Sequence, residues 1–211
     1  MILPLLLACT SAELAPVVTE DTAAADEDTA AGDTDSGAEP GCTPLAALFF
    51  DLGDTLVAEG TDGLYAALPG VITLLDALEA RGLPLGVITN VPGNWGRPEL
   101  EALLADPSIL DRFDVVLLSA EASASKPDPV IFAEAVALLS TPSLIEHTAF
   151  MTEELGHLAE ADPPTEGAQA AGMVGVHLSE GAGSLADYTV APDDLTSLAT
   201  AAWLDCLEGE S

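Results

Sequence analysis

Residues 48–57 read LFFDLGDTLV, an apolar run that ends on Asp51 and carries a second acid at Asp54. A short apolar run of this kind is typical of a strand that is buried on both faces of a sheet. In an open parallel sheet, chemistry takes place outside the carboxyl ends of the strands. Asp51 is therefore a candidate nucleophile at the end of a buried strand. The alternative is an aspartate that only forms the turn after that strand.

The composition favours one globular unit with an acidic surface. The chain has 211 residues, and its 49% of apolar side chains is enough for one core of ordinary size. Only 4 basic residues stand against 36 acidic ones, which gives a formal net charge of −32. Such a charge repels polyanions. We therefore expect no nucleic-acid partner and no electrostatic binding to an anionic membrane.

The N-terminus, residues 1–9, reads MILPLLLAC and is too short to span a bilayer. The stretch Leu6 to Cys9 resembles the lipobox of bacterial lipoproteins, in which the cysteine becomes the lipidated first residue. The run is shorter than an ordinary signal peptide and has no basic residue ahead of it, which a start codon placed too late would explain. The resemblance implies lipidation of Cys9 and an exported, periplasmic or cell-envelope lipoprotein. The alternative is a disordered apolar N-terminus.

The following segment, residues 10–41, has a composition that cannot pack a core. It holds nine acids, no base and almost no large apolar side chain after Val18. Because like charges repel and extend a chain, we expect a disordered, solvated tether between a membrane anchor and a folded domain over residues 42–211. An acidic tail without an anchor is the alternative.

The folded region alternates short apolar runs with segments of helical periodicity, which predicts an α/β fold with a parallel sheet. The strands are expected at Leu45 to Phe50, Leu85 to Thr89, Val115 to Ser119, Thr148 to Thr152 and Val174 to His177. The helices are expected at Val71 to Ala80, Pro98 to Ala105, Pro129 to Leu139, Glu166 to Ala171 and Asp194 to Trp203.

Three further polar side chains are expected at the same edge of the sheet as Asp51. Thr89 offers a hydroxyl and Asn90 an amide to a phosphate oxygen, although either residue could simply form a turn. Lys126 is the only lysine and stands just before a predicted helix. A cation at a helix N-terminus favours an anion, so a phosphate is the expected ligand. The alternative for Lys126 is a solvated surface lysine.

These stretches, in this order, resemble the haloacid dehalogenase-like (HAD) superfamily of hydrolases. FFDLGDTLV is similar to its first motif, GVITN to its second and SKPDPVIFAEA to its third. The resemblance implies a three-layer sandwich with a Rossmann-like parallel sheet. It also implies that Asp51 attacks a phosphoryl group, that Thr89, Asn90 and Lys126 bind it, and that Thr89 and Lys126 take part in catalysis with Asp51.

The sequence departs from the family pattern at two of the motifs. HAD phosphatases usually carry a proton-donating aspartate two places after the nucleophile, where this chain has Gly53. Asp54 should not replace it, because neighbouring side chains in extended backbone point opposite ways. The fourth motif reads FMTEELGHLAEAD, with Glu153 in place of the usual aspartate. The resemblance still implies Mg²⁺, held by Asp51, the Gly53 carbonyl and Glu153. His157 could replace the proton carrier or be an ordinary, partly exposed histidine.

The spacing excludes a large cap domain between the first two motifs. Only 37 residues separate Asp51 from Thr89, and most of them are needed for a loop and a helix. We expect an open site, screened at most by a flap over Ala58 to Tyr65 and by a loop in which Trp95 and Arg97 could touch the substrate.

Two functions of different classes follow from these motifs. The first is a slow Mg²⁺-dependent phosphatase that acts on a phosphorylated small molecule or an exposed phosphoryl group. The second is a HAD-like binding or surface module that has lost turnover. A dehalogenase is a third alternative, disfavoured because an apolar substrate would need the shelter of a cap. Membrane contact is expected only through the lipid anchor.

The remaining cysteines, Cys42 and Cys206, flank the predicted domain. Export would place both in an oxidising compartment, where they could form a disulfide. A bond between them would close a loop of about 165 residues and stabilise the domain by about 4–5 kcal/mol in the chain-entropy model. Two unpaired thiols are the alternative.

Overall fold

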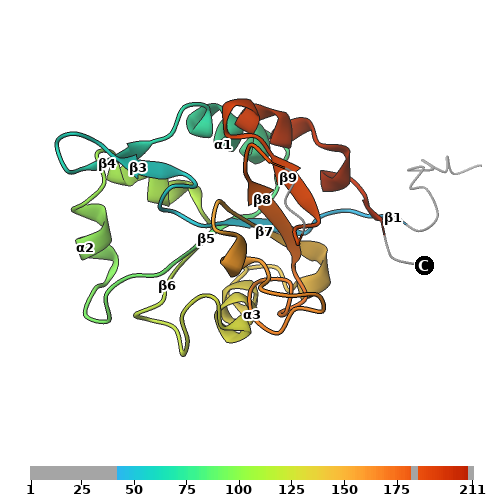
Figure 1. Cartoon of the computed structure of the whole chain (residues 1–211). Helices are drawn as coiled ribbons and strands as arrows, with labels where there is room; N and C mark the ends of the chain where they lie inside the picture. The colour runs from blue at the N-terminus through green and yellow to red at the C-terminus, as the bar shows by residue number, and fades with distance from the viewer. Residues whose placement is uncertain (1–41, 182–184, 209–211) are drawn as a thin grey trace, which may run out of the picture. The chain divides into compact units, whose positions relative to one another are not determined.

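A six-stranded sheet forms the centre of the computed structural model, which describes residues 42–181 and 185–208 (Figure 1). The strand order is β6-β5-β2-β7-β8-β9, and all neighbours pair in parallel. The predicted α/β fold is therefore confirmed. The predictions for Cys9 and for the tether lie outside the described residues. The strands are β2 (Ala47–Phe50), β5 (Leu85–Thr89), β6 (Val115–Leu118), β7 (Thr148–Thr152), β8 (Val174–Leu178) and β9 (Tyr188–Val190).

Two apolar cores, one on each face of the sheet, give the predicted three layers. Helix α1 (Val71–Ala80) and the 3₁₀ segment η4 (Pro192–Thr200) cover one face, and α3 (Pro129–Ala137) covers the other (Figure 1). The strands alternate between these cores: Leu48 and Phe50 belong to the first, and Ala47 and Phe49 to the second. Burial on both faces explains why β2 is continuously apolar.

Several helices differ from the sequence prediction. Helix α2 is shorter than expected and spans Arg97–Glu101. The helix predicted at Glu166 to Ala171 is wrong, because these residues form turns. Gly167 adopts φ +89° there, and a Cβ on it would lie 2.2 Å from the Leu158 carbonyl oxygen, so the chain makes a tight crossing in place of a helix. The C-terminal helix is 3₁₀, in η4 and η5 (Ala202–Leu204).

A small hairpin precedes α1 in the segment between β2 and β5. Strands β3 (Val57–Glu59) and β4 (Tyr65–Ala67) pair antiparallel in it, at the predicted flap. No large cap is present in the described part of the chain. The remaining short elements are 3₁₀ turns, η1 (Pro107–Arg112), η2 (Ile145–His147) and η3 (Leu155–His157).

The two ends of the domain meet in a separate two-stranded sheet. Strand β1 (Cys42–Thr43) pairs antiparallel with β10 (Leu207–Glu208). Cys206, next to β10, is disulfide-bonded. Its pairing with Cys42 stays a prediction that this strand pairing supports. None of the helices in residues 42–181 and 185–208 is both long and apolar enough to cross a membrane.

Candidate active site

The carboxyl ends of three adjacent strands bring polar side chains to one edge of the sheet. Asp51 follows β2, Thr152 ends β7 and Thr89 ends β5. The Asp51 backbone N–H donates to the Met151 carbonyl at 2.8 Å, which continues the β2–β7 ladder one residue beyond the strand. The nucleophile predicted from the sequence is thus fixed by backbone pairing and is itself mostly buried, with 7% of its surface exposed.

Lys126 forms a buried ion pair with Asp51. Its Nζ lies 2.6 Å from Asp51 Oδ1, and none of its side chain is exposed. The Leu52 backbone N–H donates to the same oxygen at 2.7 Å. A buried ammonium requires a countercharge, so this contact excludes the alternative of a solvated surface lysine. The ammonium also lies 5.3 Å from the centre of the Phe150 ring.

Asn90 holds the backbone of Lys126 in place. Its Nδ2 donates to the Lys126 carbonyl at 2.9 Å, and its Oδ1 accepts from the Lys126 N–H at 3.0 Å. Both the oxygen and the nitrogen of the Asn90 amide therefore bond to the Lys126 backbone. These bonds position the lysine. Its predicted contact with a phosphate stays a prediction, as does that of Thr89.

His157 contacts Asp51 directly, and the sequence indicated this contact only weakly. Its Nδ1 lies 3.2 Å from Asp51 Oδ2, and its Nε2 lies 3.5 Å from a Glu154 carboxylate oxygen. The Thr152 hydroxyl approaches Asp51 Oδ2 at 3.3 Å. Helical spacing from Glu153 was the only sequence signal for His157. Helical spacing did not predict this contact, because residues 155–157 form a 3₁₀ turn that brings the imidazole to Asp51.

These neighbours keep the Asp51 carboxyl group ionised. Burial raises the pKa of Asp51, but hydrogen bonding by His157 and the charge of Lys126 outweigh it and hold the pKa below its usual value of 3.8. Burial also lowers the pKa of Lys126, although Asp51 opposes this effect. Asp51 is therefore an anion at neutral pH and needs no base to activate it.

Glu153, predicted as a metal ligand, lies beside Asp51. Its Oε2 accepts from the Thr55 hydroxyl at 2.5 Å, and the Thr152 hydroxyl lies 3.3 Å from it. Thr152 thus lies between the two carboxylates, at the same distance from an oxygen of each. His177 fixes the backbone here, because its Nε2 lies 3.1 Å from the Glu153 carbonyl. Glu160, by contrast, is turned away and holds the backbone of residues 165 and 166.

The donor set fits a hard divalent cation in charge and in chemistry. Asp51, Glu153 and Glu154 supply three carboxylates against one ammonium, which leaves two negative charges uncompensated. Asp51, the Gly53 carbonyl and Glu153 are oxygen ligands of the kind that Mg²⁺ prefers. The His157 imidazole would compete with a metal ion for Asp51, because its Nδ1 lies 3.2 Å from Asp51 Oδ2. Within residues 42–181 and 185–208, no group of three or more His, Cys, Asp or Glu side chains is arranged to hold a metal ion.

His157→Ala is expected to bind Mg²⁺ more tightly than the wild type, because the imidazole and the ion would compete for Asp51 Oδ2. Removing one competing hydrogen bond should raise the affinity about 2- to 10-fold. Isothermal titration calorimetry measures the change, with His147→Ala as the control and Glu153→Gln as a variant that should bind less. Equal or weaker binding by His157→Ala would mean that the imidazole does not compete with the metal.

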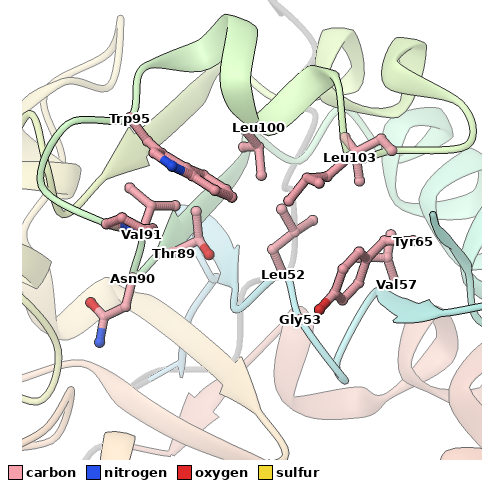
Figure 2. A pocket seen from close by; sticks show the side chains of 12 residues that line it. Leu52, Gly53, Val57, Tyr65, Thr89, Asn90, Val91, Trp95, Leu100 and Leu103 are labelled. Atoms are coloured by element: carbon pink, nitrogen blue, oxygen red, sulfur yellow. The ribbon is translucent and has the colours of Figure 1, made fainter. Parts of the chain in front are cut away.

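An apolar pocket of about 250 Å³ lies next to these strand ends. Gly53 and Thr89 line its end nearest the carboxyl ends of β2 and β5, and Figure 2 shows Trp95 and Tyr65 on opposite sides of it. Trp95 thus lies where the sequence predicted a substrate contact. Arg97 does not line the pocket, because its guanidinium pairs with Glu101 at 2.7 Å and with Asp111 at 2.8 Å.

A family model of haloacid dehalogenase-like hydrolases matches residues 49–151. This range begins at the third residue of β2 and ends within β7, so it includes Asp51, Thr89 and Lys126. The folded domain has a haloacid dehalogenase-like fold. Within this range the chain places the strand-end Asp51 against Lys126, which precedes α3.

Solved structures of HAD proteins have the same fold. A HAD phosphatase from Thermococcus onnurineus is 26% identical with a TM-score of 0.50, over 64% of this chain and 57% of that one. The chain thus spans less than two thirds of that protein's length. A HAD-superfamily hydrolase from Ehrlichia chaffeensis is 14% identical, with a TM-score of 0.55 over 76% of this chain and 98% of that one.

A predicted phosphoglycolate phosphatase from Haemophilus somnus is 18% identical to the chain. Its TM-score is 0.54, over 75% of this chain and 98% of that one. At this identity, as for the Ehrlichia protein, the likeness shows the fold alone. A comparison with curated proteins finds no match.

Proposed function

We propose that the HAD-like domain is a phosphomonoester hydrolase that forms an aspartyl phosphate on Asp51. The observation that carries the proposal is the buried Asp51–Lys126 pair, with 2.6 Å between Nζ and Oδ1, at the carboxyl end of β2. A carboxylate that is ionised, fixed by backbone pairing and placed beside a buried cation can attack a phosphoryl group that the same cation attracts. Thr89, at the end of the neighbouring strand, supplies a hydroxyl donor.

The reaction proceeds in two displacements. In the first, a carboxylate oxygen of Asp51 bonds to phosphorus, and the bond from phosphorus to the ester oxygen breaks with its electron pair on the leaving group. In the second, a water oxygen bonds to phosphorus, the aspartyl oxygen leaves as carboxylate, and the water proton passes to solvent. Lys126 neutralises charge on the phosphoryl oxygens in both steps. Mg²⁺ held by Asp51, the Gly53 carbonyl and Glu153 would add to this neutralisation.

The leaving group has no protein acid beside it at the position two residues after the nucleophile, where Gly53 stands. His157 does not line the pocket, and its Nδ1 faces the nucleophile. The leaving group therefore takes its proton from water. A general acid typically contributes about 10²–10⁴ in rate, so we propose slow turnover that favours good leaving groups.

A binding module without turnover is the second candidate. The observation in its favour is that both carboxylate oxygens of Asp51 already have neighbours, with Lys126 and the Leu52 N–H on Oδ1 and His157 and Thr152 on Oδ2. A carboxylate whose lone pairs are so occupied, and whose pKa is lowered, is a weaker nucleophile.

Trapping of the phosphoryl enzyme tests the proposal. The full chain, mixed with 4-nitrophenyl phosphate and Mg²⁺ and quenched in acid, is expected to yield a phosphorylated peptide that contains Asp51. The Asp51→Asn protein should yield none. Release of nitrophenol by the wild type without any phosphorylated peptide would contradict an aspartyl phosphate. Phosphate binding with neither product would favour the binding module.

A further inference from the structure

We propose that the pocket beside the nucleophile binds the apolar, aromatic leaving group of an aryl phosphate monoester. This inference rests on the proposed function and names the class of substrate. The pocket lies against Gly53 and Thr89, at the carboxyl ends of β2 and β5, so a group held there is next to the site at which the ester bond would break.

The walls of the pocket are aromatic and aliphatic. Figure 2 shows the Trp95 indole on one side and the Tyr65 ring on the other, with Leu52, Leu100 and Leu103 between them. Aromatic side chains bind a flat ring through stacked or edge contacts that add to the burial of apolar surface. A volume of about 250 Å³ is enough for one ring and its substituents, and is small among ligand pockets.

The pocket is held open by backbone bonds between its walls. Tyr65 N–H donates to the Leu103 carbonyl at 2.8 Å, and the Ala105 N–H donates to the Tyr65 carbonyl at 2.8 Å. These bonds tie the β3–β4 hairpin to the segment after α2. Because the cavity is preformed, a ligand does not have to order these segments when it binds.

The charges argue against a second anionic group on the substrate. None of the residues that line the pocket is charged. The chain has four basic residues, and all lie in its described part: Lys126 pairs with Asp51, and the three arginines pair with acids elsewhere. A carboxylate or second phosphate in the pocket would have no cation to pair with and would face a protein of charge −32.

The lack of an acidic side chain at position 53 also favours an aryl phosphate as the substrate. The oxygen of a phenol has a pKa of roughly 10, far below that of an aliphatic alcohol, so it leaves without being protonated first. When the ester bond breaks, the electron pair goes to the aryl oxide, which then takes a proton from water. A pocket for a ring and a site without a general acid are thus complementary.

Binding of phosphonates tests the pocket without turnover, because their carbon–phosphorus bond is not hydrolysed. Phenylphosphonate is expected to bind about 10- to 100-fold more tightly than methylphosphonate, as burial of one aromatic ring implies. 4-Carboxyphenylphosphonate should bind more weakly than phenylphosphonate. Trp203→Phe leaves Trp95 as the only tryptophan, so quenching of its fluorescence reports occupancy of the pocket.

Trp95→Ala should remove most of the preference for the phenyl compound, measured by calorimetry. Leu138→Ala is the control and should keep the preference, because Leu138 is an exposed leucine at the C-terminal end of α3 that does not line the pocket. Equal affinity for the two phosphonates, no binding of phenylphosphonate, or a preference that survives Trp95→Ala would overturn the aryl pocket. Phosphonate discrimination without any phosphorylation of Asp51 would instead leave the pocket intact and contradict only the hydrolase. Turnover that depends on Asp51, together with equal affinity for the two phosphonates, would contradict the aryl pocket and leave the hydrolase intact.

Discussion

Asp51→Asn is expected to lower the hydrolysis of 4-nitrophenyl phosphate by a factor on the order of 10³ or more, because an amide oxygen is a poor nucleophile and no other group replaces it. The asparagine keeps the shape of the aspartate and can still accept from the Leu52 N–H, which lies 2.7 Å away in the wild type. The buried ammonium of Lys126 loses its countercharge, so its pKa should fall further. The measurement is kcat/KM with saturating Mg²⁺.

Asp54→Asn is the matched control for this variant. Asp54 is an exposed acid three residues further on, and it adopts φ +55°, a conformation that asparagine tolerates well. Its rate should equal that of the wild type. If Asp51→Asn and the wild type show the same rate while both remain folded by circular dichroism, the hydrolysis arises elsewhere and the proposed enzyme does not exist.

Gly53→Asp is expected to raise kcat/KM on alkyl phosphates by about 10²–10⁴, and to change the rate on aryl phosphates much less. The new carboxyl group would stand where HAD phosphatases usually carry the proton donor. A Cβ built on Gly53 meets no atom within 4 Å outside the neighbouring residues, so the first carbon of the side chain has open space. Gly53 lines the pocket, which places the acid next to the leaving oxygen.

Gly53→Asn distinguishes the effect of the carboxyl proton on the rate from the effect of side-chain size. It has the same size as the aspartate but carries no titratable proton, so it should gain nothing on alkyl substrates. The measurement is the ratio of kcat/KM for glycerol phosphate to that for 4-nitrophenyl phosphate in all three proteins. An equal gain with Asp and Asn, or none with Asp, would show that protonation of the leaving group does not limit the rate.

The strands and the position of Asp51 at the end of one of them could be predicted from the sequence, because burial acts locally. A strand covered on both faces must be apolar throughout, so β2, β5 and β7 are visible as short runs such as ALFF and LGVIT. The polar residue that ends each run is then at the carboxyl edge. The scarcity of basic residues drew attention to Lys126, the only lysine of the chain, as a residue at the same edge of the sheet that would bind an anion.

The helical segments near the C-terminus were less predictable because tertiary packing outweighs local propensity there. The residues at 166–171 have a composition that suits a helix, yet Gly167 lies against the Leu158 carbonyl and its N–H donates to the Pro127 carbonyl at 2.6 Å. These contacts join segments 9 and 40 residues apart. No local pattern in the sequence encodes them.

The sequence by itself determined the fold class, the strand-end Asp51 and its lysine, because each depends on burial or on the rarity of a residue type. Only the tertiary structure decided what surrounds the carboxylate. His157 lies 106 residues after Asp51, and its contact with Oδ2 exists because β7 pairs with β2 and the chain turns back after β7. The aryl pocket, likewise, is made where the β3–β4 hairpin is bonded to the segment after α2. Contacts of this kind depend on strand order and on the paths of loops. The periodicity of the sequence predicts neither of these.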